Sequence, residues 1–141
     1  MFQPTFFHVA VTVNDLNKFE AFYAKHFGFY RARTFILGEG KEMFFLKNDS
    51  GFYFEVFPAD EERPIPHAEA DGPHYQGIRH LAFSVPDVDK KIEEMGADAI
   101  ITLGPLSFDA FIPGWKTAWL KDPENNIIEI TQGYTDEVKN V

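Results

Sequence analysis

The chain has 141 residues, of which 45% are hydrophobic, so it is long enough and apolar enough to bury the core of one domain. Its formal net charge is −9 and it lacks a basic stripe, which excludes nucleic acid as an expected partner. Because there is no cysteine, any metal has to be held by imidazole and carboxylate groups. The sequence shows neither a secretion signal nor an apolar stretch of membrane-spanning length, which predicts a cytoplasmic protein without membrane contact.

In chain order, residues 8–13 alternate between apolar and small or polar side chains, as a strand does. An Asn-Asp pair then marks the start of a helix over residues 16–27, and Gly28 marks its end. Three more strands are expected, at residues 29–37, 42–47 and 52–57. A connector, 59–76, follows; it is rich in Pro, Asp, Glu and His and has no periodicity, so we expect it to be exposed.

The second half repeats this order. Residues 80–88 align without gaps with residues 8–16, and a helix is expected over 88–95, ending at Gly96. Strands are then predicted at residues 99–103, 116–120 and 126–132, with an irregular stretch at 104–114. The sequence therefore predicts an α+β fold of two βαβββ modules, about residues 5–58 and 77–133, within a single domain spanning 1–141.

Four residues in strand interiors carry the predicted chemistry. His80 lies 72 residues after His8, and Glu129 lies 74 residues after Glu55. A carboxylate among aromatic or branched apolar neighbours is costly to bury unless it is paired or binds a cation. Each residue alone is more simply a hydrogen-bonded histidine or a surface glutamate. If a pseudo-twofold axis relates the modules, however, the four side chains converge into one divalent-metal site, and the duplication favours this interpretation.

These residues resemble the vicinal oxygen chelate superfamily, which includes glyoxalase I, bleomycin and fosfomycin resistance proteins, extradiol dioxygenases and methylmalonyl-CoA epimerase. The resemblance covers nearly the whole chain and rests on the runs that begin at His8 and His80, the helix end at 27–29, Glu55, and the turn and strand at 122–129. It implies a cupped mixed sheet around the metal, with helices on the outside. The order His, Glu, His, Glu is similar to the glyoxalase I branch. Dioxygenases and fosfomycin resistance enzymes use three protein ligands, so a fourth ligand at Glu55 argues against them.

The resemblance implies a lactoylglutathione lyase-like (glyoxalase I-type) metalloenzyme that acts on a small carbonyl or hemithioacetal substrate through a metal-stabilised enediolate. Glu129 would be the general base, and Glu55 is the symmetric candidate for returning the proton. A divalent ion such as Ni, Zn, Co or Mn would fit this donor set. The expected partners are a small-molecule substrate and a second copy of the chain in a homodimer, with the site either within one chain or across the dimer interface.

Substrate contacts are less well defined by the sequence. Tyr53, Phe57 and Trp119 are expected to form an apolar wall. Glyoxalase I usually has an Arg four residues after its first His, whereas this chain has Thr12 there, so glutathione is not implied. Candidate anion contacts are Arg33, Arg79 and Lys116, for each of which a solvated surface position is the simpler interpretation.

Two alternative functions are consistent with the same residues. One is an Fe(II) extradiol-type dioxygenase, which needs open coordination positions for oxygen and a catechol. The other is a non-catalytic, bleomycin-resistance-like protein that binds a flat aromatic compound in an aromatic-rich cup.

Overall fold

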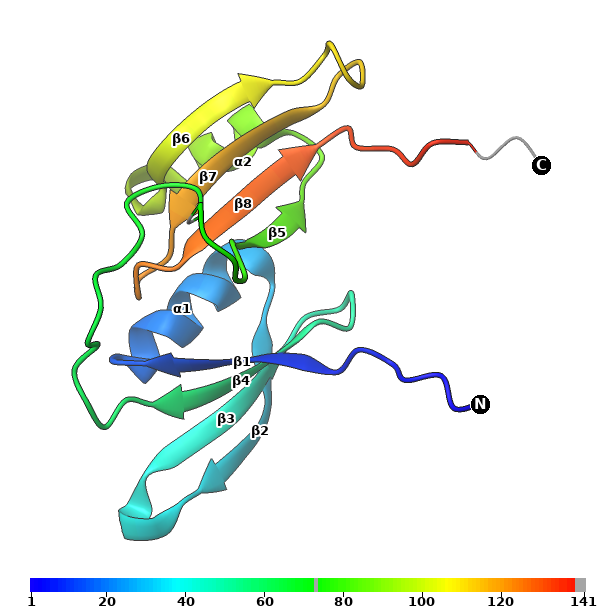
Figure 1. Ribbon diagram of the computed structural model, residues 1–141. Coiled ribbons are helices and arrows are strands. Elements are labelled where there is room, and N and C mark those ends of the chain that lie inside the picture. The colour runs from blue at the N-terminus through cyan, green and yellow to red at the C-terminus, as the bar shows by residue number, and fades with distance from the viewer. Residues whose placement is uncertain (73, 139–141) are drawn as a thin grey trace. The chain divides into compact units, whose positions relative to one another are not determined.

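A computed structural model describes residues 1–72 and 74–138. The chain forms two compact units, Met1–Ile65 and Pro66–Val141, and we describe each unit by itself. The division between them falls inside the predicted connector. Both units have the same order of strands and helix (Figure 1).

The first unit contains one α-helix and a four-stranded mixed sheet in the order β1-β4-β3-β2. Its elements are β1 (His8–Val13), α1 (Leu16–Phe27), β2 (Tyr30–Ile36), the short 3-10 turn η1 (Gly38–Gly40), β3 (Glu42–Lys47) and β4 (Tyr53–Pro58). Strand β1 pairs in parallel with β4, and the other neighbours are antiparallel.

The second unit repeats the plan, with its sheet in the order β5-β8-β7-β6. Its elements are β5 (Leu81–Ser84), α2 (Val88–Met95), the 3-10 turn η2 (Gly96–Asp98), β6 (Ile100–Ser107), β7 (Lys116–Lys121) and β8 (Ile127–Gln132). Again the first and last strands, β5 and β8, pair in parallel. The predicted α+β class with two βαβββ modules is confirmed.

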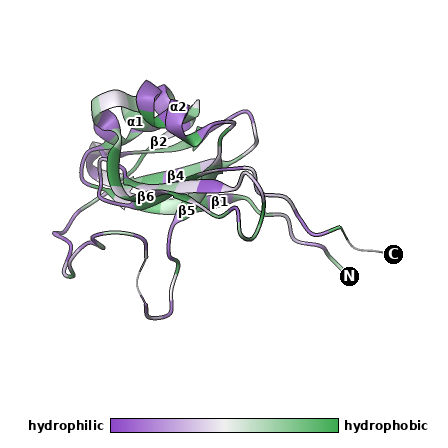
Figure 2. Cartoon of the chain, turned by 90° about the horizontal axis from the view of Figure 1, so that it is seen from above, coloured by the Kyte–Doolittle hydropathy of each residue, from purple (hydrophilic) through white to green (hydrophobic). Residues whose placement is uncertain are grey.

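Alternation along the strands separates a core face from a second face in each sheet. Phe54 and Val56 of β4 are fully buried, and the rings of Phe19 and Tyr23 from α1 lie 5.4 and 4.9 Å from that of Phe54, centroid to centroid. In the second unit the fully buried residues of β8 are its isoleucines 128 and 130. Hydrophobic residues are concentrated in the strands, whereas α2 is largely hydrophilic (Figure 2). Consequently the residues between these core positions, Glu55 and Glu129, lie on the face away from the helix.

Both helices begin as the sequence predicts. The carboxylate of Asp15 accepts a hydrogen bond from the backbone N–H of Lys18 at 3.0 Å, and that of Asp87 accepts one from Lys90 at 2.9 Å. These bonds satisfy backbone donors that have no partner within a first helical turn. At the end of α1, Gly28 has a φ of 68°, a left-handed conformation that glycine adopts without steric cost. Within the described part of the chain, no helix is long and apolar enough to cross a membrane.

The prediction for β6 was wrong at its C-terminal end. The sequence predicts that the strand ends at Leu103, but β6 continues to Ser107, with register shifts against β7 on both sides of Leu103. Gly104 has a φ of 89° and is followed by a cis bond to Pro105. Because β6 is an edge strand, it tolerates an irregular pairing and a proline that would disrupt a central strand.

Replacing Asp87 by alanine should lower the free energy of unfolding by about 1 kcal/mol, because the first turn of α2 loses its side-chain cap. Urea denaturation followed by circular dichroism measures this change. Asp87→Asn keeps an oxygen acceptor and is expected to lose less. Equal unfolding midpoints for wild type and Asp87→Ala would show that the cap does not stabilise the helix.

Candidate functional site

In the first unit, His8 and Glu55 lie together on the face of the sheet away from α1. The parallel pairing of β1 with β4 places Ala10 opposite Glu55, and His8 is two residues earlier on the same face. The Nε2 atom of His8 is 3.1 Å from Oε2 of Glu55, and the two side chains are 30% and 20% exposed. The structure therefore brings together the two site residues predicted in this half.

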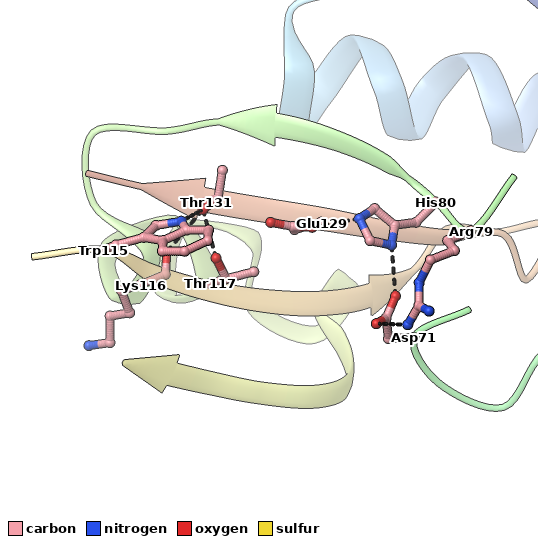
Figure 3. Close-up of polar contacts among 8 residues, drawn as sticks. All are labelled: Asp71, Arg79, His80, Trp115, Lys116, Thr117, Glu129 and Thr131. Carbon is pink, nitrogen blue, oxygen red and sulfur yellow. Dashed lines mark hydrogen bonds and ion pairs between the residues drawn. The ribbon is translucent and has the colours of Figure 1, made fainter. Parts of the chain in front are cut away.

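The second unit repeats this arrangement. Ala82 of β5 lies opposite Glu129 of β8, and Nε2 of His80 is 2.6 Å from Oε2 of Glu129 (Figure 3). The two side chains are 19% and 13% exposed, so this pair is more buried than the first. In both units the same ring nitrogen of the histidine faces the same oxygen of the glutamate.

The contacts of the other ring nitrogen, Nδ1, differ between His80 and His8. Nδ1 of His80 lies 2.7 Å from Oδ1 of Asp71, whose Oδ2 accepts a hydrogen bond of 2.7 Å from Nη2 of Arg79 (Figure 3). Burial raises the pKa of the Asp71 carboxyl, but its hydrogen bonds with Arg79 and His80 bring the pKa below its ordinary value. Nδ1 of His8, in contrast, is buried and has no hydrogen-bond partner among the described residues.

Aromatic side chains surround the first pair. Phe45 of β3 lies opposite Glu55, and its ring centroid is 5.4 Å from that of His8. Phe7 meets the His8 ring edge to face, with centroids 4.6 Å apart. Tyr53, predicted as a substrate contact, is the register partner of His8. The wall near this carboxylate is therefore mainly apolar.

The remaining predicted substrate contacts of this unit also lie on the glutamate face. Phe57 is two residues beyond Glu55 on β4 and pairs with Thr12 of β1, which is exposed. A residue that the sequence interpretation missed, Lys47, holds its Nζ 5.2 Å from the centroid of the Tyr53 ring. It places a positive charge on the same face.

The second pair has a more polar surrounding. Trp119 lies opposite Glu129, at the position that Phe45 occupies in the first unit, and its buried Nε1 has no hydrogen-bond partner within residues 1–72 and 74–138. Beyond Glu129, the hydroxyl of Thr131 accepts a hydrogen bond of 2.9 Å from Nε1 of Trp115 and lies 2.6 Å from the hydroxyl of Thr117 (Figure 3). The position equivalent to Phe57 thus carries a hydroxyl group instead of a ring.

Each of the three candidate anion contacts interacts with another side chain of the protein. Arg79 binds Asp71, Lys116 pairs with Asp89, and the Arg33 guanidinium lies 5.9 Å from the ring centroid of its neighbour at position 35. Arg33 and Arg79 are exposed, in agreement with the simpler interpretation of a surface position, whereas Lys116 is half-buried.

The residues missed by the sequence interpretation differ in how they could have been found. Phe45 lies 74 residues before Trp119, the same offset that relates the two glutamates, so the repeat would have identified it. Asp71 lies in the connector, nine residues before His80, and no periodicity or motif marks it.

The donors suit a divalent ion. Two ligands about 2.1 Å from a metal, at ordinary angles, lie roughly 3.0–3.4 Å apart. The 3.1 Å between His8 and Glu55 falls in this range, and the 2.6 Å of the second pair is somewhat shorter. The described residues include no group of three or more His, Asp or Glu side chains that could hold a metal ion. Each unit therefore supplies a pair of donors and not a complete coordination shell.

Three comparisons relate the chain to known proteins. A family model described as the Glyoxalase/Bleomycin resistance protein/Dioxygenase superfamily matches residues 5–130. The uncharacterized protein YwkD of Bacillus subtilis (strain 168) is 28% identical over 124 residues, covering 87% of this chain and 92% of that protein. The crystal structure of a glyoxalase family protein from Enterococcus faecalis is 28% identical, with a TM-score of 0.66, and the match covers 93% of this chain and 99% of that one.

A more distant structure shows the fold alone. The fosfomycin resistance protein FosX from Listeria monocytogenes, crystallised with Mn(II) and sulfate, has a TM-score of 0.66 at 17% identity. The match covers 94% of this chain and 95% of FosX.

Replacing Thr131 by valine should lower the free energy of unfolding by about 1–3 kcal/mol, because it removes the acceptor of the Trp115 N–H and the partner of the Thr117 hydroxyl. Thr131→Ser keeps the hydroxyl and should be closer to wild type. Urea denaturation of the three proteins makes the comparison. If the valine and serine variants are equally stable, the hydroxyl contacts do not stabilise the module.

Proposed function

Because this chain belongs to the Glyoxalase/Bleomycin resistance protein/Dioxygenase superfamily, we propose that it is a metal-dependent, glyoxalase-like lyase or isomerase. Its substrate would be a small carbonyl compound or a hemithioacetal. The observation that carries the proposal is the His–Glu pair that recurs at equivalent register positions of the two sheets.

We assign His8, Glu55, His80 and Glu129 as ligands of one divalent ion, two from each repeat. Two imidazoles and two carboxylates suit Ni, Zn, Co or Mn. The presence of Mn(II) in FosX, which shares the fold, supports a divalent ion. When bound, the metal would supply Lewis-acid polarisation of adjacent substrate oxygens. Members of the superfamily often form dimers, and we expect a homodimer here as well.

Glu129 is the proposed general base. Its carboxylate is only 13% exposed, and Trp119 lies opposite it on β7, so few water molecules compete for its oxygens. The proton would pass from a carbon beside the substrate carbonyl to the Glu129 carboxylate. Glu55, at the equivalent position of the first repeat, would return a proton to the neighbouring carbon.

Each pair offers a substrate different surroundings, apolar at the first pair and more polar at the second. Tyr53, Phe57 and Phe45 offer ring surface on the first sheet, and Thr12 adds an exposed hydroxyl at its edge. On the second sheet, a substrate oxygen that accepted a hydrogen bond from Nε1 of Trp119 would satisfy a donor whose isolation costs about 1–3 kcal/mol.

Metal content tests the ligand assignment. Elemental analysis of the purified full chain should find about one divalent ion per chain, because the four proposed protein donors make up one site. His8→Ala and His80→Ala should each lower this content. His67→Ala, which removes an exposed histidine of the connector, is the matched control and should retain the metal. Metal-free wild type after equilibration with Ni, Zn, Co and Mn would overturn the proposal.

Proton exchange tests the base. With small carbonyl compounds and hemithioacetals in deuterated water, wild type should exchange the hydrogen on the carbon beside the carbonyl. Glu129→Gln should slow this exchange by about 100-fold or more, because an amide cannot accept the proton. Glu94→Gln, an equal change at an exposed position of α2, should leave the rate unchanged. NMR measures the exchange directly.

Assays of proton exchange, oxygen consumption and ligand binding distinguish the proposed lyase from a dioxygenase and from a non-catalytic binding protein. If wild type exchanges no such proton but consumes oxygen with catechols, it is a ring-cleaving dioxygenase and not a lyase. If it binds aromatic compounds equally well after treatment with a chelator and catalyses neither reaction, it is a binding protein. Unchanged exchange in Glu129→Gln would remove Glu129 as the base.

A further inference from the structure

We infer that Asp71 is a positioning residue, which holds the His80 ring in one tautomer and one orientation so that its Nε2 is available to the metal. The inference rests on the proposed function, because it concerns how a ligand of the proposed metal is prepared. It assigns a role to the connector, which the sequence predicts to be an exposed and featureless link.

Each ring nitrogen of His80 faces a carboxylate oxygen: Nδ1 lies 2.7 Å from Oδ1 of Asp71, and Nε2 lies 2.6 Å from Oε2 of Glu129. An imidazole that binds a metal through Nε2 carries its proton on Nδ1, and the ionised Asp71 carboxylate can accept the hydrogen bond from that N–H. The Asp71 contact therefore favours the tautomer that leaves Nε2 available to the metal. A carboxylate in this position also makes the imidazole a more basic ligand.

Arg79 holds the Asp71 carboxylate in place. Its Nη2 donates to Oδ2 of Asp71 at 2.7 Å, so each carboxylate oxygen has its own partner and the group cannot rotate without losing one of them (Figure 3). The Asp71 side chain is 17% exposed, which limits competition from water. The next residue, Gly72, allows this approach because a Cβ there would lie only 2.7 Å from Cβ of Arg79.

Among the described residues, no carboxylate holds the histidine of the first repeat in this way. The equivalent nitrogen of His8, Nδ1, has no hydrogen-bond partner among the described residues. Because Nδ1 of His80 is held by Asp71, His80 is the more strongly oriented of the two histidines. Loss of Asp71 should therefore weaken metal binding through His80 alone.

Metal affinity is the first measurement. Competition between the full chain and a chromophoric chelator for Zn(II) gives the dissociation constants of wild type and variants. Asp71→Ala should bind Zn(II) about 10–100-fold more weakly, the usual effect of losing such an outer partner. Asp71→Asn keeps an oxygen acceptor and should be intermediate. Asp89→Ala, which removes the same charge from an exposed ion pair with Lys116, is the matched control and should equal wild type.

The tautomer is the second measurement, and a purely structural role for Asp71 would not change it in folded protein. In the metal-free chain at about pH 8, where an ordinary imidazole is neutral, ¹⁵N shifts should show a larger fraction of His80 protonated on Nδ1 in wild type than in Asp71→Ala. In that variant only the Glu129 contact at Nε2 remains, so the proton should move toward Nε2. If that variant does not fold, Asp71→Asn and Arg79→Gln provide the same comparison with smaller changes.

The possible results distinguish a failure of the role inferred for Asp71 from a failure of the proposed metal site. Wild type that binds no Zn(II) would refute the proposed metal site. Wild type that binds Zn(II) while folded Asp71→Ala binds equally well and keeps its tautomer would overturn the inference and leave the function intact. Equal weakening in Asp71→Ala and Asp89→Ala would also overturn it, since the effect would then be one of net charge.

Discussion

A carboxylate in the interior of a strand, surrounded by apolar side chains, has to be paired, and the structure depends on how this chain meets that constraint. Glu55 and Glu129 both lie between core residues, and each faces the Nε2 atom of a histidine. Parallel pairing of the first and last strands of each sheet makes this possible, because it brings the His-bearing strand beside the Glu-bearing strand. Alternation then places both side chains away from the helix.

The two repeats share the geometry of the His–Glu pair but differ in the side chains around it. The first pair is lined by aromatic rings, such as that of Phe45. The second is bordered by a tryptophan and by the hydroxyl cluster around Thr131. Asp71 adds a further difference, because it contacts His80 and nothing equivalent contacts His8 within the described residues. Under the proposed function, Glu55 and Glu129 would therefore perform their different steps in different surroundings.

Short-range sequence features, such as capping residues, explain why the helices are predicted well. The bounds of α1 and α2 agree with the prediction because Asp15 and Asp87 cap them through bonds spanning three residues. The sequence repeat shows that each half carries one His and one Glu, whereas their contact within each half depends on the parallel pairing of the first and last strands. The end of β6 depends on its place at the sheet edge, which no short segment reveals. The contact of Asp71 with His80 depends on the path of an aperiodic loop, so it could not be predicted.

X-ray absorption spectroscopy of the metal-loaded protein can show whether both repeats bind the same ion, because it counts imidazole ligands on the ion itself. We expect two imidazoles with oxygen donors in wild type, and one imidazole in His8→Ala and in His80→Ala, since each repeat contributes one histidine. A wild-type spectrum with no imidazole, or one left unchanged by either substitution, would contradict the claim that the two His–Glu pairs hold one metal.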